Sequence, residues 1–293
     1  MTEERQNAGE GGKSGQLKIF FGYAAGVGKT YAMLQAALTA EERGMDVVIG
    51  SIAPYRSLED TALAERLRAM ERLEEFDLDR AIRRKPDLII MDDLACENPK
   101  GSRHSRRYQD IRELLKAGIS VYTTVSAQNI ESLNDIVTAI TRVPVKDRIP
   151  DSVFDHADQV ELVDLEPREL LERLRNGALA EKEGEHPPGT AYFTMANLTA
   201  LREVALRRCA DRINMLTRGD GAAHGDEHVL VCLSASPSNA KIVRTAARMA
   251  NAFRGAFTAL FVKTPDLAYM DEEDRKRLQS HMRLAEQLGA RIE

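Results

Sequence analysis

The sequence has 293 residues, of which 43% are hydrophobic and 30% are charged, and its formal net charge is −5. This composition indicates a globular protein with one large or two medium-sized domains, and the negative charge argues against duplex nucleic acid as a main partner. Because no apolar run approaches the ~18 residues of a membrane span, and the N-terminus is too polar for a signal peptide, we expect a cytoplasmic chain without membrane insertion.

The cysteines and histidines show no pattern of a disulfide framework or a metal site. Cys96, Cys209 and Cys232 are too few and too far apart for either, and they indicate reduced thiols. The six histidines show no His-x-x-x-His spacing. We therefore expect no metal site built from these side chains.

Strands and helices alternate along residues 16–178. Residues 1–15 before them are polar and lack periodicity, which predicts a disordered leader. The predicted strands begin at residue 17 and then cover 47–49, 88–91, 119–125 and 160–163. The predicted helices cover about 28–43, 58–75, 78–84, 106–117, 130–140 and 167–175. This alternation predicts an α/β fold, a P-loop NTPase-like parallel sheet with helices on both faces.

A second α/β pattern follows a linker. Residues 179–226 contain a linker and a long connecting helix. The strongest linker pattern covers 178–190, and the helix is predicted at about 193–218. Residues 227–293 predict strands at 229–233 and 256–262 and helices at 237–253 and 271–288, and the sequence stops just where a third strand should start. Because two strands cannot bury a parallel sheet, we predict a truncated Rossmann-like domain or one that needs a partner edge.

The turn between the first strand and the first helix has the pattern of a phosphate loop. Its candidate nucleotide-binding residues are Ala25, Gly26, Val27, Gly28, Lys29 and Thr30. The backbone N–H groups of such a turn bind an anion together with the positive end of the following helix, the lysine reaches β- and γ-phosphate oxygens, and the threonine hydroxyl suits Mg²⁺. The first glycine of the usual spacing falls at Tyr23, so a purely structural glycine turn is the alternative.

Two aspartates follow the apolar strand 88–91. Asp92 stands where P-loop proteins place the carboxylate that holds the Mg²⁺ shell through water, so Thr30 and Asp92 are predicted to bind Mg²⁺ with ATP. Asp93 is a secondary candidate for the base that polarises an attacking water. The alternative is that both residues only begin a loop.

The turn at 101–107, with the sequence GSRHSRR, is rich in basic residues. Such a turn is able to contact phosphates or to act across a subunit interface. A solvated helix start is equally compatible with the pattern, and the sequence leaves these alternatives open.

Ordered sequence blocks along most of the chain resemble a known family. From about Leu17 to the chain end, the sequence is similar to the N-terminal cytoplasmic region of the KdpD potassium-sensor histidine kinases. The blocks are GVGKTYAML at 26–34, Asp92-x-Leu-Ala, GSRH at 101–104, YTT at 122–124, ESLND at 131–135, PDSV at 150–153 and NLTALRE at 197–203. In that family a P-loop regulatory domain precedes a universal-stress-protein-like domain, which the resemblance implies for 16–178 and 227–293.

Three positions depart from the pattern of this family. Its members usually carry Glu-Thr-His-Gly near 53–56, a glutamate at the position of Asp93 and a histidine at the position of Cys96. These acidic and imidazole groups are absent here, whereas the loop amides, Lys29 and Thr30 remain. We therefore expect ATP binding with at most a weak ATPase activity.

A serine pair ends the first strand of the second α/β segment. Ser234 and Ser236 lie where a strand end opens onto a helix N-terminus, which is a natural phosphate or ribose site, although serines also cap helices routinely. The resemblance implies cyclic di-AMP as the ligand, because some KdpD kinases bind it with such serines and a following FTA-x-Tyr strand. The matching strand residues are Phe257, Thr258, Ala259 and Phe261, the last in place of tyrosine.

These observations predict a regulatory, nucleotide-binding input module of a two-component potassium or osmotic sensing system. The implied cofactor is ATP with Mg²⁺, and the implied partner is a sensor histidine kinase or response regulator of a potassium-uptake system. None of the six histidines lies in a His-Glu-x-x-Arg/Lys phosphoacceptor sequence, so we expect no kinase activity from this chain itself.

Other functions and assemblies stay open at this point. One alternative is a P-loop ATPase or small-molecule kinase that uses Lys29, Thr30, Asp92 and Asp93. Another is a degenerate scaffold without nucleotide binding. The sequence also leaves open a homodimer and a peripheral location on a membrane-bound sensor complex.

Overall fold

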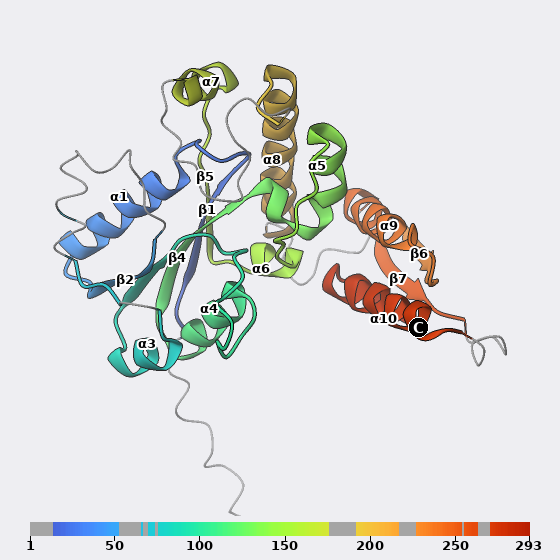
Figure 1. The fold of residues 1–293 in the computed structure, drawn as a ribbon, viewed down its shortest axis with the longest axis horizontal. Coiled ribbons are helices and arrows are strands. Elements are labelled where there is room, and N and C mark those ends of the chain that lie inside the picture. The colour runs from blue at the N-terminus through green and yellow to red at the C-terminus, as the bar shows by residue number, and fades with distance from the viewer. Residues whose placement is uncertain are drawn as a thin grey trace, which may run out of the picture. The chain divides into compact units, whose positions relative to one another are not determined.

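The computed structural model describes residues 14–52, 66, 70–73, 76–175, 192–216, 227–253, 255–262 and 270–293 (Figure 1). Several sequence predictions lie mostly or wholly outside these residues, namely the leader at 1–15, the segment 53–56, the helix at 58–75 and the linkers at 178–190 and 217–227. The chain divides into two compact units, residues 1–125 with 157–188 and residues 126–156 with 189–293. Residues 126–156, which lie inside the predicted range 16–178, group with the second unit.

The first unit is built on a five-stranded parallel sheet, as the alternation of elements predicts. Its strands are β1 (Leu17–Gly22), β2 (Val47–Ser51), β3 (Leu88–Met91), β4 (Ser120–Ser126) and β5 (Gln159–Leu162). They lie in the order β2-β3-β4-β1-β5. The register pairs Ile90 with Tyr122 and Ile19 with Val160. Strand β4 therefore separates β1, which leads into the glycine-rich turn, from β3, which precedes Asp92.

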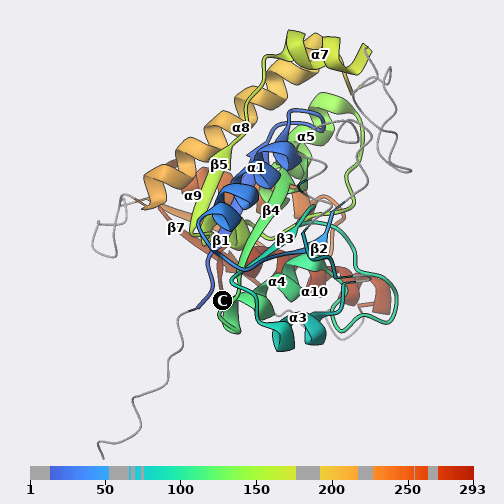
Figure 2. The same cartoon turned by 90° about the vertical axis from the view of Figure 1, so that its left-hand side faces the viewer.

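Four described helices complete the first unit. They are α1 (Lys29–Glu42), α3 (Leu78–Arg84), α4 (Arg107–Lys116) and α7 (Pro167–Arg175). Helix α1 packs against the sheet (Figure 2) and buries an apolar cluster with alternate residues of β1, β2 and β3. The cluster includes Met33, Leu34, Ala37, Phe20, Ile49, Leu88 and Ile90. Asp77 caps α3 as expected, because its carboxylate accepts the N–H of Arg80 at 3.1 Å.

The helices of the second unit come from two separate parts of the chain. Two 3-10 turns, η2 (Ala127–Asn129) and η3 (Glu131–Leu133), precede α5 (Asn134–Thr141) and α6 (Asp151–Asp155), and α8 (Met195–Leu216) follows later. The helix predicted at 130–140 is thus shorter and begins after 3-10 turns. Helix α5 packs against α8, whose buried face is formed by Leu198, Leu201, Ala205, Arg208 and Arg212. Neither α8 nor any other described helix is long and apolar enough to cross a membrane.

A smaller parallel sheet ends the second unit. Its order is β6 (His228–Cys232), β7 (Ala256–Leu260) and β8 (Arg291–Ile292), and α9 (Asn239–Phe253) and α10 (Glu272–Gln287) pack beside it. The prediction of two strands was wrong, because the last residues of the sequence already pair with β7 as a short third strand. One face of the sheet shares an apolar cluster with both helices. Its buried members are Val231, Leu233, Val243, Ala246, Ala259, Leu278, Leu284 and Ala285. Leu230, on the other face of β6, remains 55% exposed.

Candidate functional site

The glycine-rich turn joins the first strand of the sheet to the first helix through two glycines with left-handed backbone. Strand β1 ends at Gly22 and helix α1 begins at Lys29, so the turn joins a strand end to a helix N-terminus. Gly26 and Gly28 have φ values of +85° and +104°, which only glycine adopts without strain. The Lys29 ammonium donates to the carbonyl of Ala24 at 2.8 Å, so the lysine side chain lies back along the turn. The loop amides, the helix end and this ammonium together are suited to bind an anion.

Tyr23 stands at the position where the usual spacing of the motif has its first glycine. The ring is fully buried, and its hydroxyl donates to the carbonyl of Leu165 at 2.9 Å. Among the described non-glycine residues, positive φ values occur at Lys85, Asp93 and Arg142, so the backbone of Tyr23 needs no glycine.

The close approach that usually requires the first glycine falls instead on Gly22, one residue earlier. A Cβ at Gly22 would lie 2.6 Å from Cγ2 of Val27 and 3.1 Å from Cγ of Lys29. A side chain at Gly22 would therefore press on Val27 and Lys29 of the turn.

Asp92 follows β3 and lies against the start of α1. The Thr30 hydroxyl donates to its two carboxylate oxygens at 3.1 and 3.3 Å. The Thr124 hydroxyl, from the intervening strand β4, donates to Oδ1 at 2.6 Å. Asp92 is only 3% exposed. The structure thus brings together the predicted pair Thr30 and Asp92, and it adds Thr124, which belongs to the block YTT at 122–124 but to which the sequence analysis gave no role.

Asp93 and Arg107 shape the same strand end. Asp93 has φ of +60°, and its N–H donates to Oδ1 of Asp92 and to the Thr124 hydroxyl, both at 3.1 Å. The Arg107 guanidinium donates to the main-chain carbonyls of Asp92 and Asp93. Arg107 is therefore a second residue that sequence reasoning did not single out by role, although it lies in the basic turn. These contacts orient the main chain that carries both carboxylates.

The basic turn at 101–107 is largely neutralised by carboxylates of its own unit. Arg103 pairs with Asp79 and Glu113, His104 lies 2.7 Å from Glu113, and Arg106 pairs with Glu97. The neighbouring His104 and Arg103 lower the pKa of the Glu113 carboxyl. These pairs favour a structural role for most of the turn, with Arg107 as its link to the candidate site.

The predicted serine site lies in the loop between β6 and α9. Asn239 accepts the N–H of Ser234 at 3.2 Å and donates to the carbonyl of Cys232 at 3.1 Å. From α10, His281 lies 2.8 Å from the carbonyl of Ser234, and Arg277 donates to that of Ala235 at 3.2 Å. Asn239 and His281 are 3% and 5% exposed. Buried side chains thus hold this serine loop by its main chain.

The remaining predicted residues of this site run along β7. Phe257 and Phe261 are partly buried against the apolar cluster, and Ala259 belongs to it. Thr258 lies on the opposite face, where its hydroxyl is 2.8 Å from His228. Strands β6 and β7 are parallel, and the N–H of Leu233 donates to the carbonyl of Leu260. Phe261 therefore lies at the carboxyl end of β7, on the same side of the sheet as the carboxyl end of β6, where the serine loop begins. Phe257 lies at the other end of the strand, away from Ser234 and Ser236.

A family model and several curated proteins match most of this chain. The family model described as KdpD, the osmosensitive K⁺ channel His kinase sensor domain, matches residues 13–213. The chain is 46% identical over 294 residues to the sensor protein KdpD of Clostridium acetobutylicum, covering 95% of this chain and 32% of that protein. It is 42% identical over 297 residues to the sensor protein KdpD of Escherichia coli, covering 94% and 33%. The chain thus spans about a third of the length of these relatives, and it belongs to the KdpD sensor-domain family.

Proposed function

We propose that this chain is a regulatory nucleotide-binding input module of a two-component system that responds to potassium or osmotic conditions. The observation that carries the proposal is the convergence of the glycine-rich turn, Thr30 and Asp92 at one end of the first sheet. The family assignment supports a role in signal input, since the two relatives are named sensor proteins.

The chemistry of the first unit suits ATP with Mg²⁺. The loop amides and the N-terminus of α1 bind the phosphate chain, and Lys29 exchanges the carbonyl of Ala24 for phosphate oxygens. The Thr30 hydroxyl ligates Mg²⁺, and Asp92 holds water of the metal shell. Binding needs these groups alone, whereas hydrolysis also needs a positioned base. We propose that nucleotide occupancy rather than turnover is the signal passed to a sensor kinase or response regulator.

Calorimetric titration of Mg–ATP into the intact chain and into Lys29→Ala tests this proposal. We expect the variant to bind about 10- to 100-fold more weakly, because it loses a charge-assisted hydrogen bond to phosphate. Lys116→Ala, an exposed lysine in the last turn of α4, is the matched control and should bind like the intact chain.

Each outcome assigns the unit to one class of protein. Equal affinity of the intact chain and Lys29→Ala would reduce the loop to a structural turn and favour the scaffold alternative. Steady phosphate release that Lys29→Ala abolishes would replace the proposal with a P-loop ATPase.

The second part of the proposal is cyclic di-AMP binding at the serine loop. Ser234, Ser236 and Phe261 follow the carboxyl ends of the paired strands β6 and β7, and hydroxyls with an aromatic side chain there would suit a phosphate and a base. In the double variant Ser234→Ala/Ser236→Ala, we expect cyclic di-AMP to bind about tenfold more weakly in calorimetry. Ser152→Ala, on the exposed side of α6, serves as the control. Unchanged affinity in the double variant would limit these serines to capping the start of α9.

A further inference from the structure

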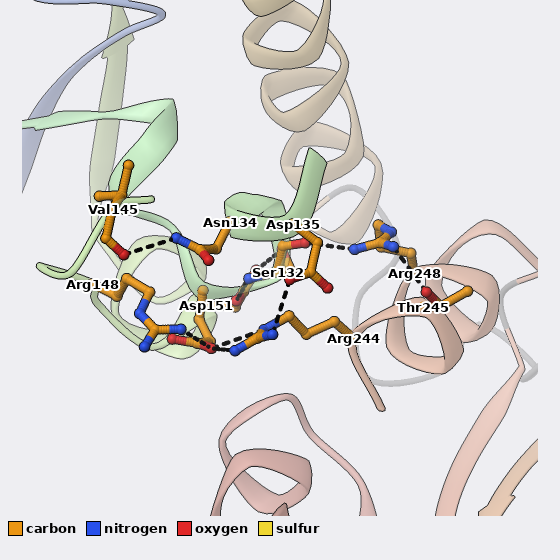
Figure 3. Close-up of polar contacts among 10 residues, drawn as sticks. Ser132, Asn134, Asp135, Val145, Arg148, Asp151, Arg244, Thr245 and Arg248 are labelled. Carbon is orange, nitrogen blue, oxygen red and sulfur yellow. Dashed lines mark hydrogen bonds and ion pairs between the residues drawn. The ribbon is translucent and has the colours of Figure 1, made fainter. Parts of the chain in front are cut away.

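Helix α9 carries two faces of different character. Val243 and Ala246 belong to the apolar cluster that α9 shares with β6, β7 and α10. Arg244 and Arg248 lie one turn apart and reach the η3–α5 segment, residues 131–141 (Figure 3). This helix therefore joins the 227–293 part of the second unit to a segment more than a hundred residues earlier in the chain.

Arg244 is the centre of this joint. Its Nε and Nη2 donate to Oε1 of Glu131 at 3.0 and 2.7 Å, and its Nη1 donates to Oδ1 of Asp135 at 3.0 Å. The Arg244 and Glu131 side chains are each 11% exposed. Oε1 of Glu131 also accepts from Arg148 at 3.1 Å. The pair is thus nearly buried and forms a branched network rather than a single surface contact.

Arg248 adds a second connection through the main chain. Its Nη1 donates to the carbonyl of Ser132 at 2.8 Å, and its Nη2 donates to the Thr245 hydroxyl at 3.0 Å. Ser132 is itself held, since its N–H and hydroxyl donate to the Asp151 carboxylate at 3.0 and 2.6 Å. Burial lowers the pKa of the Arg248 guanidinium, which Asp135 partly offsets. Both arginines therefore depend on partners in the η3–α5 segment.

Among the residues that the structure describes, the apolar cluster of the small sheet has no member in the η3–α5 segment. Every member of that cluster lies between Val229 and Ile292. The 227–293 part thus has a core of its own, and described polar contacts connect α9 to η3 and α5. Buried ion pairs contribute little net stability, because separation returns both charges to water, but they strongly favour one geometry when closed. Such a joint can separate without unfolding either side.

We propose that α9 is an ionic latch, in which Arg244 and Arg248 hold the 227–293 part on the η3–α5 segment and release it as a folded body when their pairs break. The latch is independent of whether nucleotides bind elsewhere in the chain. It gives the second unit a closed and an open state that differ in the exposure of Glu131, Asp135 and the two arginines.

Hydrogen exchange of the full chain, measured by mass spectrometry on Arg244→Gln, tests the latch. We expect amides in 131–141 and 239–253 to exchange about tenfold faster or more, because the variant leaves Glu131 and Asp135 short of a partner. Amides of β6 and β7 should keep their protection. Arg207→Gln is the matched control, since Arg207 pairs with Glu203 on α8 with both side chains more than 70% exposed.

Three outcomes decide the question. Faster exchange confined to the two joined surfaces supports the latch. Equal loss of protection in β6 and β7 would overturn it, because the joint would then belong to one cooperative core. No change relative to Arg207→Gln would also overturn it. In the double variant Glu131→Gln/Arg244→Gln, exchange should stay within about twofold of the Arg244→Gln value, as expected for two residues that act through one contact.

Discussion

Gly15→Ala is expected to lower the free energy of unfolding by about 3 kcal/mol or more. A Cβ at Gly15 would lie 2.0 Å from the carbonyl oxygen of Ile119 and 2.3 Å from its carbonyl carbon. These are backbone atoms, so no side-chain rotation relieves the clash. The N–H of Gly15 also donates to the carbonyl of Leu115 at 2.8 Å, so a shift of the backbone loses that hydrogen bond. The methyl group must therefore part β1 from β4, and the melting temperature should fall by about 10 °C.

Gly44→Ala separates this clash from the general cost of replacing a glycine. Gly44 has φ of +87°, but a Cβ there meets nothing within 4 Å. The variant should therefore lose only about 1–2 kcal/mol, the cost of a left-handed conformation for alanine. Thermal melting of both variants by circular dichroism compares them directly. If Gly15→Ala melts at the same temperature as Gly44→Ala, the close backbone contact between Gly15 and Ile119 does not exist.

Arg208→Met is expected to destabilise the second unit by about 3 kcal/mol at neutral pH. The Arg208 side chain is 8% exposed and donates to Asp155 at 2.5 Å and to Asp151 at 3.4 Å. Its guanidinium also lies 4.7 Å from the ring centre of Phe154. Methionine keeps much of the volume but leaves two carboxylates without their cation. Urea unfolding followed by circular dichroism should show the loss.

The pH dependence of this loss has a definite sign. Burial raises the pKa of Asp151 above its ordinary value of 3.8, and Arg208 opposes that rise. Without Arg208 the pKa of Asp151 in the folded protein rises further. Ionised Asp151 then lowers the free energy of unfolding by its full amount only at a pH above this folded pKa. The loss disappears as the pH falls below 3.8, because Asp151 is then protonated in the folded and in the unfolded chain. The difference between intact chain and variant should therefore shrink toward acid pH.

Arg207→Met, one residue earlier on α8, is the control for Arg208→Met. Its pair with Glu203 is exposed, and the change should cost no more than about 0.5 kcal/mol. A loss of equal size in both variants would show that helix propensity, and not the buried charges, determines the effect.

Short-range signals were sufficient to predict most secondary-structure elements. A continuous apolar run predicts β3, Pro167 begins α7, and Asp77 caps α3, because each signal acts within a few residues of the element that it defines. The pair of Thr30 and Asp92 was also predictable, since both residues stand at fixed places relative to a strand end. In these cases the sequence pattern contains the relevant geometry.

Strand order and distant contacts were not predictable in this way. Alternation of strands and helices predicts parallel pairing but not which strands are neighbours, so the position of β4 and the contact of Thr124 with Asp92 could not be inferred. Arg107 binds main-chain carbonyls, which carry no sequence signature. The pairing of Arg244 with Glu131 connects residues 113 positions apart, and nothing local distinguishes these residues from solvated charges.

The neighbours of β1 have a consequence for how the protein is made. The strand that leads into the glycine-rich turn is made before the strands beside it, and the hydroxyl of its following residue, Tyr23, bonds a carbonyl 142 residues further on. At roughly 5–20 residues per second, translation needs about 7–28 s to cover that separation. During this interval the nascent LKIFFG segment lacks its neighbour β4 until Ser120–Ser126 are made, and it lacks its other neighbour, β5, until the end. Slower initiation or chaperone binding at this stage should therefore raise the soluble yield, because unpaired apolar strands associate with one another.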